Sequence, residues 1–98
     1  MTTKNPLEKE IEKAVCDHAK SLGWYTRKFT STAHIGVPDQ LMIPPSGKVM
    51  FIEFKALGKK PTVMQYREHE KLHAVNAYVF VIDNIEDGIA LVNVWHDQ

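Results

Sequence analysis

Two strand-like segments separated by a tight turn are the feature that most restricts how this chain can fold. Residues 39–43 (DQLMI) and 48–55 (KVMFIEFK) are mostly apolar, and the PPSG sequence between them is typical of a turn. Such a turn fixes the register of the two strands, so that residues whose numbers sum to about 91 or 92 lie opposite each other. The middle of the chain is therefore predicted to form an antiparallel hairpin.

The segments around this hairpin show the periodicities of helices and of a buried strand. Asn5 is suited to cap the first helix, and Pro6 is suited to its first turn. Residues 84–98 fit both helical and strand spacing, so their structure stays open. The order αβββαβ, with a mixed sheet flanked by helices, predicts an α/β domain. The expected elements are a helix at 5–22, strands at 24–29, 39–43 and 48–55, a helix at 62–75 and a strand at 77–83, with a loop at 30–38.

Composition limits the class of protein. The 98 residues suit one domain over 1–98, in which residues 84–98 form a tail and a candidate interface element. The formal net charge is zero, so binding to nucleic acid would require lysines gathered on one face or a second subunit. Cys16 is the one cysteine, which excludes an intrachain disulfide and suits a reducing compartment. No segment has the apolar length of a membrane span or the core of a signal peptide, so we expect a cytoplasmic location.

The hairpin register brings two acidic side chains together. Asp39 and Glu53 satisfy the register condition and are expected to lie opposite each other or one step apart. Directly opposed side chains have Cβ atoms roughly 4.5–5.5 Å apart, and two carboxylates at that distance repel unless something lies between them. A divalent cation is the obvious candidate, so the pattern predicts a metal site.

Glu53 and Lys55 extend this candidate site along the second strand. Residues two apart on a strand point to the same face, whereas Phe54 between them points into a core. The Phe54 carbonyl would stay near the carboxylates as a further oxygen ligand, and such hard ligands suit Mg²⁺ or Mn²⁺. Lys55 would orient or deprotonate an attacking water, or stabilise negative charge in a phosphoryl transition state. The alternative is a surface hairpin whose charges simply face water.

The same residues carry a resemblance to a known family. GVPD at 36–39 followed by FIEFK at 51–55 resembles the PD-(D/E)xK nuclease superfamily, and residues 36–72 resemble its virus-type replication-repair nuclease domain, VRR-NUC. The resemblance covers roughly residues 11–86, and its motifs are specific only as an ordered set. It implies a restriction-endonuclease-like core. By this resemblance the metal-binding acids are Asp39 and Glu53, the catalytic lysine is Lys55, the family's glutamine is Gln65 and the first-helix acid is Glu12.

This resemblance implies a metal-dependent endonuclease that cleaves DNA phosphodiesters with Mg²⁺ or Mn²⁺. Similar proteins often act on branched or flapped DNA, such as Holliday junctions, in viral replication, repair or recombination, and the stand-alone viral members are expected to form homodimers. Gln65 would then orient Lys55 or the water, and Glu12 would be an outer metal ligand. Ile35 and Gln40 stand where such proteins often have basic residues, so this loop lacks two positive charges that are common there.

Other polar residues near the proposed site are candidate DNA contacts. Lys59 and Lys60 directly follow the site strand and are predicted to contact phosphates. His34, in the loop before the site, and His69, on the second helix, are weaker candidates for the same role.

Three aromatic residues are also informative. Trp24 and Tyr25 stand at a helix-to-strand junction, so we expect both to lie in the core instead of stacking on a DNA base. Trp95, near the end of the chain, is expected to be exposed and to belong to a subunit interface.

The sequence HEKLH at 69–73 supports a different hypothesis. Two histidines one helical turn apart, with a glutamate after the first, are the signature of zinc proteases. A zinc site also needs a third protein ligand, and the downstream candidates Glu86 and His96 stand in no recognisable motif.

Helical phase gives a simpler explanation of the two histidines. Met64, Leu72 and Val75 share one apolar stripe, which is expected to face the sheet. His69 and His73 are then partly exposed helix residues.

A third hypothesis is a catalytically silent DNA-binding module with the same fold. Carboxylates that face the phosphates of DNA would weaken binding, so the intact acid pair with Lys55 favours an enzyme.

Overall fold

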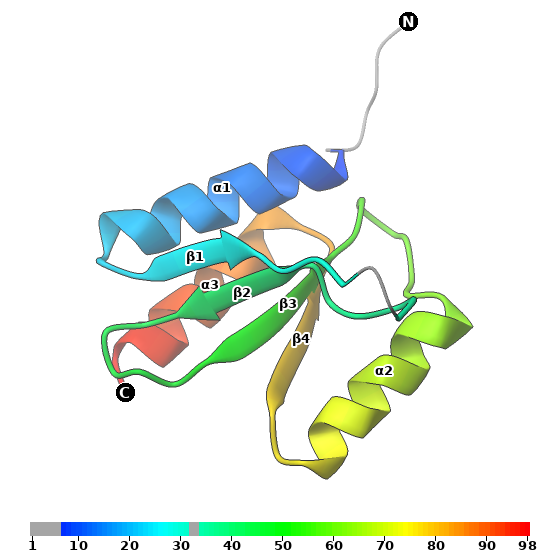
Figure 1. Cartoon of the computed structure of the whole chain (residues 1–98). Helices are drawn as coiled ribbons and strands as arrows, with labels where there is room; N and C mark the ends of the chain where they lie inside the picture. The colour runs from blue at the N-terminus through cyan, green and yellow to red at the C-terminus, as the bar shows by residue number, and fades with distance from the viewer. Residues whose placement is uncertain (1–6, 32–33) are drawn as a thin grey trace, which may run out of the picture.

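The computed structural model describes residues 7–31 and 34–98, and Figure 1 shows its elements in chain order. The predicted αβββαβ order is confirmed, and the open segment 84–98 forms a third helix. Asn5 and Pro6, predicted at the start of the first helix, lie outside the described residues. No helix in the described ranges is long and apolar enough to cross a membrane. The elements are α1 (Glu8–Ser21), β1 (Tyr25–Lys28), β2 (Gln40–Ile43), β3 (Met50–Phe54), α2 (Val63–Ala74), β4 (Tyr78–Ile82) and α3 (Ile85–His96).

The four strands form one mixed sheet in the order β1-β2-β3-β4. β1, β2 and β3 are antiparallel neighbours, and β4 runs parallel to β3 after the connection through α2. Gln40 pairs with Ile52, and Met42 pairs with Met50, which confirms the predicted hairpin register. The paired segments are shorter than predicted. Pro44 directly follows β2, and a proline cannot donate a hydrogen bond to extend the ladder.

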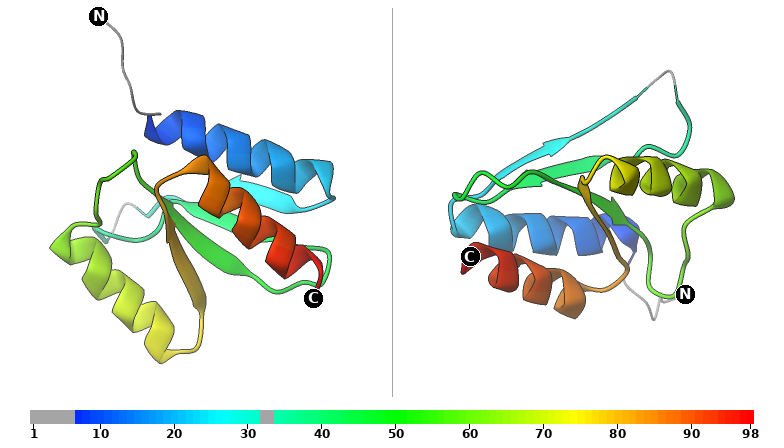
Figure 2. Two further views of the ribbon diagram at one scale, coloured as in Figure 1. Left: turned by 180° about the vertical axis from the view of Figure 1, so that it is seen from behind. Right: turned by 90° about the horizontal axis from the view of Figure 1, so that it is seen from below.

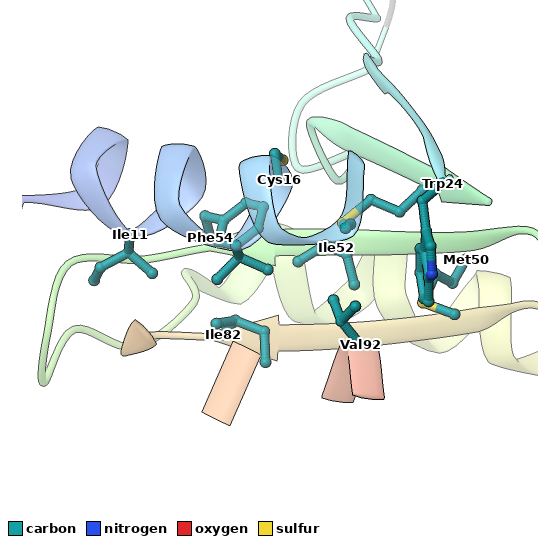
Figure 3. Packing of buried hydrophobic residues seen from close by; sticks show 11 residues of the cluster. Ile11, Cys16, Trp24, Met50, Ile52, Phe54, Ile82 and Val92 are labelled. Atoms are coloured by element: carbon teal, nitrogen blue, oxygen red, sulfur yellow. The ribbon is translucent and has the colours of Figure 1, made fainter. Parts of the chain in front are cut away.

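The helices lie on both faces of the sheet, with α1 and α3 on one face and α2 on the other (Figure 2). Apolar side chains between the sheet and the α1–α3 layer form the core, which includes Ile11, Phe54 and Val92, each at most 1% exposed (Figure 3). Cys16 belongs to this cluster, and burial raises the pKa of its thiol to about 11. The one cysteine is therefore a packing residue.

The predicted burial or exposure of the aromatic residues is confirmed only in part. Trp24 is buried as predicted, and its indole N–H donates to His96 Nδ1 at 3.1 Å. The prediction that Tyr25 is buried is wrong: it is 49% exposed, because strand alternation turns it to the opposite face from the core. The prediction that Trp95 is exposed is also wrong, since its ring packs edge-on against Tyr78 at a centroid distance of 4.7 Å and adjoins the core.

Helix α2 does not bury the apolar stripe that its sequence predicts. Met64 and Val75 are 45% and 73% exposed, so the predicted stripe is wrong. His69 is 5% exposed, which corrects the prediction that it is partly exposed. A helix that packs through polar side chains breaks the usual pattern, and such departures are expected at functional sites. The four least exposed residues of α2 share one face at helical spacing and are Gln65, Glu68, His69 and Leu72.

Gly88 lets α3 approach α1 closely, and its replacement by alanine tests this packing. A Cβ at Gly88 would overlap the methyl groups of Val15, which is itself buried. Overpacking costs about 1–3 kcal/mol, against a gain of up to about 1 kcal/mol in helix propensity. We therefore expect Gly88→Ala to lower the free energy of unfolding in urea by about 1–2 kcal/mol. Combined with Val15→Ala the losses should be less than additive, and full additivity would contradict the contact.

Candidate active site

Asp39 and Glu53 lie at the end of the β2–β3 ladder. The last pair of that ladder is Gln40 and Ile52, so the next step of the same register sets Asp39 opposite Glu53. The Asp39 carbonyl accepts a hydrogen bond from the Phe29 N–H at 2.9 Å, which extends the sheet to this point. Glu53 is 3% exposed, and Asp39 is half-buried. The fold thus brings together the two acids that the sequence singled out.

Each acid of the pair has one oxygen that is left without a partner. Oδ1 of Asp39 and Oε1 of Glu53 are buried and have no hydrogen-bond partner among the described residues. Burial, and then the charge of Asp39, raises the pKa of Glu53 to about 7, while Lys55 opposes this shift. Burial also raises the pKa of Asp39, with Lys28 opposing it. A buried carboxyl oxygen without a partner is costly, and the donor set of two such hard oxygens fits a divalent cation that would remove this cost.

Lys55 lies beside Glu53 at the end of β3. Its backbone N–H donates to the Ile82 carbonyl at 2.9 Å, which fixes this segment against β4. Its Nζ lies 4.0 Å from Glu53 Oε2, and the side chain is 14% exposed. Phe54 between them is fully buried in the core, as predicted. The Glu-x-Lys spacing therefore holds one positive charge beside the acid pair.

Gln65 connects the start of α2 to Glu53. Its Oε1 accepts the Thr62 N–H at 2.8 Å, and the Gln65 N–H donates to Thr62 Oγ1 at 3.2 Å, which together form a capping box. Because Oε1 is used by this cap, Nε2 points away from it and donates to Glu53 Oε2 at 3.1 Å. Gln65 thus contacts the Glu53 carboxylate, whereas the sequence predicted that it orients Lys55 or a water.

His69 lies one helical turn beyond Gln65 and faces the other oxygen of Glu53. Its Nε2 is 3.8 Å from Glu53 Oε1, and that nitrogen has no hydrogen-bond partner among the described residues. Burial, and then the proximity of His73, lowers the pKa of His69. A side chain enclosed in this way does not face the surface, so the predicted DNA contact of His69 is incompatible with its position.

The GVPD loop packs directly on the start of α2. Gly36 has a φ of +94°, which L side chains rarely adopt. A Cβ at Gly36 would lie 2.5 Å from the Met64 carbonyl oxygen and 2.9 Å from the Gln65 nitrogen. The glycine therefore allows the loop that carries Asp39 to touch the helix that carries Gln65.

Two acids of α1 lie at the edge of this site. Both carboxylate oxygens of Glu12 contact Lys28 Nζ, at 2.8 and 2.9 Å. Lys28 pairs with Gln40 across the β1–β2 ladder, so its positive charge lies close to the neighbour of Asp39 in the chain. Glu8 stands in no motif of the sequence, yet its charge contributes to the raised pKa of Glu53. Glu8 lies one helical turn before Glu12, and this spacing is the signal that points to it.

The candidate DNA contacts lie in two loops at the same end of the sheet. Lys59 and Lys60 are exposed between β3 and α2, and His34 is exposed between β1 and β2 (Figure 1). A surface hollow of about 490 Å³ is lined by both His34 and Asp39. His34 thus lies near Asp39, and Lys59 and Lys60 follow Lys55 closely in the chain, while their contacts with DNA stay predictions.

The HEKLH histidines form no zinc site. His73 Nε2 lies 3.4 Å from the Val79 carbonyl oxygen, and His96 accepts the indole N–H of Trp24. Within residues 7–31 and 34–98, no three His, Cys, Asp or Glu side chains are arranged to hold a metal. Zinc sites need at least three protein ligands, so the protease hypothesis has no support. Magnesium commonly binds through one or two carboxylates and keeps several waters, which the acid pair allows.

Known proteins share both the sequence and the fold. The chain is 43% identical over 77 residues to "Putative nuclease p44" of Acyrthosiphon pisum secondary endosymbiont phage 1, over 79% of this chain and 83% of that protein. A solved structure described as "VRR_NUC domain" aligns with a TM-score of 0.80 at 32% identity, over 88% of this chain and 94% of that one. The chain belongs to the VRR_NUC family. A "VRR_NUC domain protein" at 20% identity has the same fold, with a TM-score of 0.76 over 92% of this chain and 88% of that one. No protein-family model matches the sequence.

The buried acid of this VRR_NUC domain gives its metal-free form a characteristic pH dependence. The pKa of Glu53 is raised from 4.5 to about 7, so the folded state binds more protons between these values. The stability that neutral Glu53 contributes is present below pH 4.5 and is lost as the pH rises through about 7. The glutamine of Glu53→Gln is neutral at every pH. The free energy of unfolding of this variant should therefore exceed that of wild type by on the order of 3 kcal/mol at pH 8, but by little at pH 5.

Urea unfolding in EDTA at both pH values measures this difference. Glu70 is exposed on the same helix that covers Glu53, so Glu70→Gln is the matched control and should keep the wild-type pH dependence. Parallel pH dependences for wild type and Glu53→Gln would contradict the raised pKa.

Proposed function

We propose that this nuclease hydrolyses phosphodiester bonds of DNA with a divalent cation, Mg²⁺ or Mn²⁺, held by Asp39 and Glu53. The observation that carries this proposal is the pair of acids beside Lys55, each with one buried, unpartnered oxygen. DNA is a polyanion, so two bare carboxylates would repel it unless a cation lies between them. Metal-dependent hydrolysis accounts for the acids, their burial and the adjacent lysine together.

Each group near the acid pair has a role in this reaction. When bound, the cation would activate a water and offset the negative charge that develops on the phosphate. The Phe54 carbonyl would be a further ligand of the cation, and Glu12 an outer one. The Lys55 ammonium, 4.0 Å from the Glu53 carboxylate, would donate to a phosphate oxygen or to the attacking water. Gln65 donates to one oxygen of the Glu53 carboxylate.

The proposed substrate is branched or flapped DNA, such as a four-way junction. The formal net charge of zero provides little long-range attraction to DNA. Binding then depends on local contacts from Lys59, Lys60 and His34 in the two loops that border the acid pair. A branched substrate allows two subunits to hold two arms at once, which compensates for few contacts in each subunit.

The proposed assembly is a homodimer. Helix α2 packs beside β4, so it leaves β1 and β2 uncovered on that face of the sheet (Figure 2). Apolar side chains line the uncovered area, and among them Tyr25 and Val49 are 49% and 43% exposed. Contact between two such faces would remove this apolar surface from water.

Cleavage of a labelled DNA panel tests the proposed reaction. The panel contains a four-way junction, a flap, a nicked duplex, a plain duplex and a single strand, each with Mg²⁺, Mn²⁺ or EDTA. Wild type should cut a branched member with metal and none in EDTA. Lys55→Ala and Glu53→Ala should each lower the rate by at least about 100-fold, because each removes a group at the reacting phosphate or its metal. Lys71→Ala, at a mostly exposed lysine of α2, should keep the wild-type rate.

Circular dichroism separates lost chemistry from lost folding in these variants. Glu53→Ala should keep the folded signal, because it also removes the repulsion between the acids. Binding of the panel by wild type without any cleavage would overturn the proposal in favour of a catalytically silent DNA-binding module.

Light scattering during size-exclusion chromatography tests the dimer. The chain has a mass of 11.2 kDa, and wild type should elute with twice that mass. Val49→Glu should give the single-chain mass, because a charge in the interface would lose its hydration without a partner. Val94 is 57% exposed on α3, so Val94→Glu is the matched control and should keep the wild-type mass. A single-chain mass for wild type would contradict the proposed assembly.

A further inference from the structure

Helix α2 presents two polar side chains to the two oxygens of one carboxylate. Gln65 Nε2 donates to Glu53 Oε2 at 3.1 Å, and His69 Nε2 lies 3.8 Å from Glu53 Oε1. The two residues are one helical turn apart, so they project from the same face of the helix. His69 Nε2 and Glu53 Oε1 are both buried and have no hydrogen-bond partner among the described residues. A possible donor and an acceptor, both unpartnered, therefore face each other.

Core packing gives no reason for a histidine at this position. His69 is 5% exposed, whereas Met64 and Tyr66 on the same helix are 45% and 49% exposed. An unsatisfied buried polar atom costs about 1–3 kcal/mol, which an apolar side chain of similar size would avoid. The helix thus exposes apolar residues and buries a polar one directly beside Glu53.

We propose that His69 is a positioning residue that donates from Nε2–H to Glu53 Oε1 while Gln65 holds Oε2. The inference rests on the proposed function, in which Glu53 binds the divalent cation. A hydrogen bond to a charged carboxylate is about 2.7–2.9 Å long, so the present gap closes by about 1 Å through rotation of the side chains. With one donor on each oxygen, the Glu53 carboxylate has a single orientation toward Asp39.

Two neutral donors suit this task better than a second cation would. The amide of Gln65 carries no charge, and a neutral imidazole ring likewise donates from one ring nitrogen. Neutral donors orient a ligating carboxylate and leave its negative charge available to a metal, whereas an added positive charge would compete with the metal. Lys55 already supplies one positive charge at 4.0 Å from Glu53.

The Mn²⁺ affinity of the DNA-free protein tests this inference, with free Mn²⁺ measured by electron paramagnetic resonance. His69→Leu removes the donor and keeps most of the volume, and it should weaken Mn²⁺ binding by about tenfold or more. His69→Gln keeps an N–H donor of similar reach and should stay within about threefold of wild type. His73→Leu makes the same change at an exposed position one turn further along α2 and should bind like wild type.

Two further comparisons make the result decisive. His69→Asn has a polar side chain that is too short to reach Glu53, so it should lose affinity like His69→Leu and replaces that variant if His69→Leu fails to fold. Wild-type affinity in a folded His69→Leu or His69→Asn would overturn the inference. If His69→Gln lost as much Mn²⁺ affinity as His69→Leu, the inference would also be overturned. Such a result would mean that the N–H donor does not matter and that His69 has only a structural role. If wild type itself binds no Mn²⁺, the proposed metal site fails instead, so the two failures are distinguishable.

Discussion

The burial of the Glu53 carboxylate beneath α2 is the constraint on which the rest of the site depends. A buried carboxylate needs donors, and Gln65 supplies one only because its other amide atom is fixed by the Thr62 N–H in the helix cap. The interaction that begins α2 therefore also sets the direction of the donor. Gly36 then brings the loop of Asp39 onto the same turn of the helix. The first turn of α2, the loop and the acid pair are consequently one packed unit.

The apolar core on one face of the sheet offsets the free-energy cost of the polar groups that are buried on the other face. Side chains of β3 alternate, so Ile52 and Phe54 enter the core under α1 and α3, while Glu53 between them turns to the α2 face. The apolar contacts that stabilise the domain lie on the first face, where Val15 and Gly88 bring α1 and α3 close together. The second face is thereby free to carry polar groups whose burial costs free energy.

The sequence predicts the hairpin site better than the helix that covers it, for a physical reason. The side-chain period of a strand is two and the turn fixes the register, so Asp39 and Glu53 follow from counting. The phase of α2 was mispredicted because the amphipathic pattern assumes that apolar side chains such as Met64 face inward. Trp95 was mispredicted because its contacts depend on whether its segment is a helix, which local spacing left open. Glu8 follows from the sequence only through its helical spacing from Glu12, because its own relation to Glu53 is tertiary.

The HEKLH motif shows why spacing on a helix does not identify a site by itself. His69 is four residues from Gln65 on one side and from His73 on the other, so either pair shares a helix face. The position of α2 over β3 decides between them, because it turns Gln65 and His69 toward Glu53 and leaves His73 exposed near β4. The same histidine that resembles a zinc ligand in the sequence thus lies against a carboxylate in the fold. A helical motif is consequently informative only together with the side chains that its neighbouring strand presents to it.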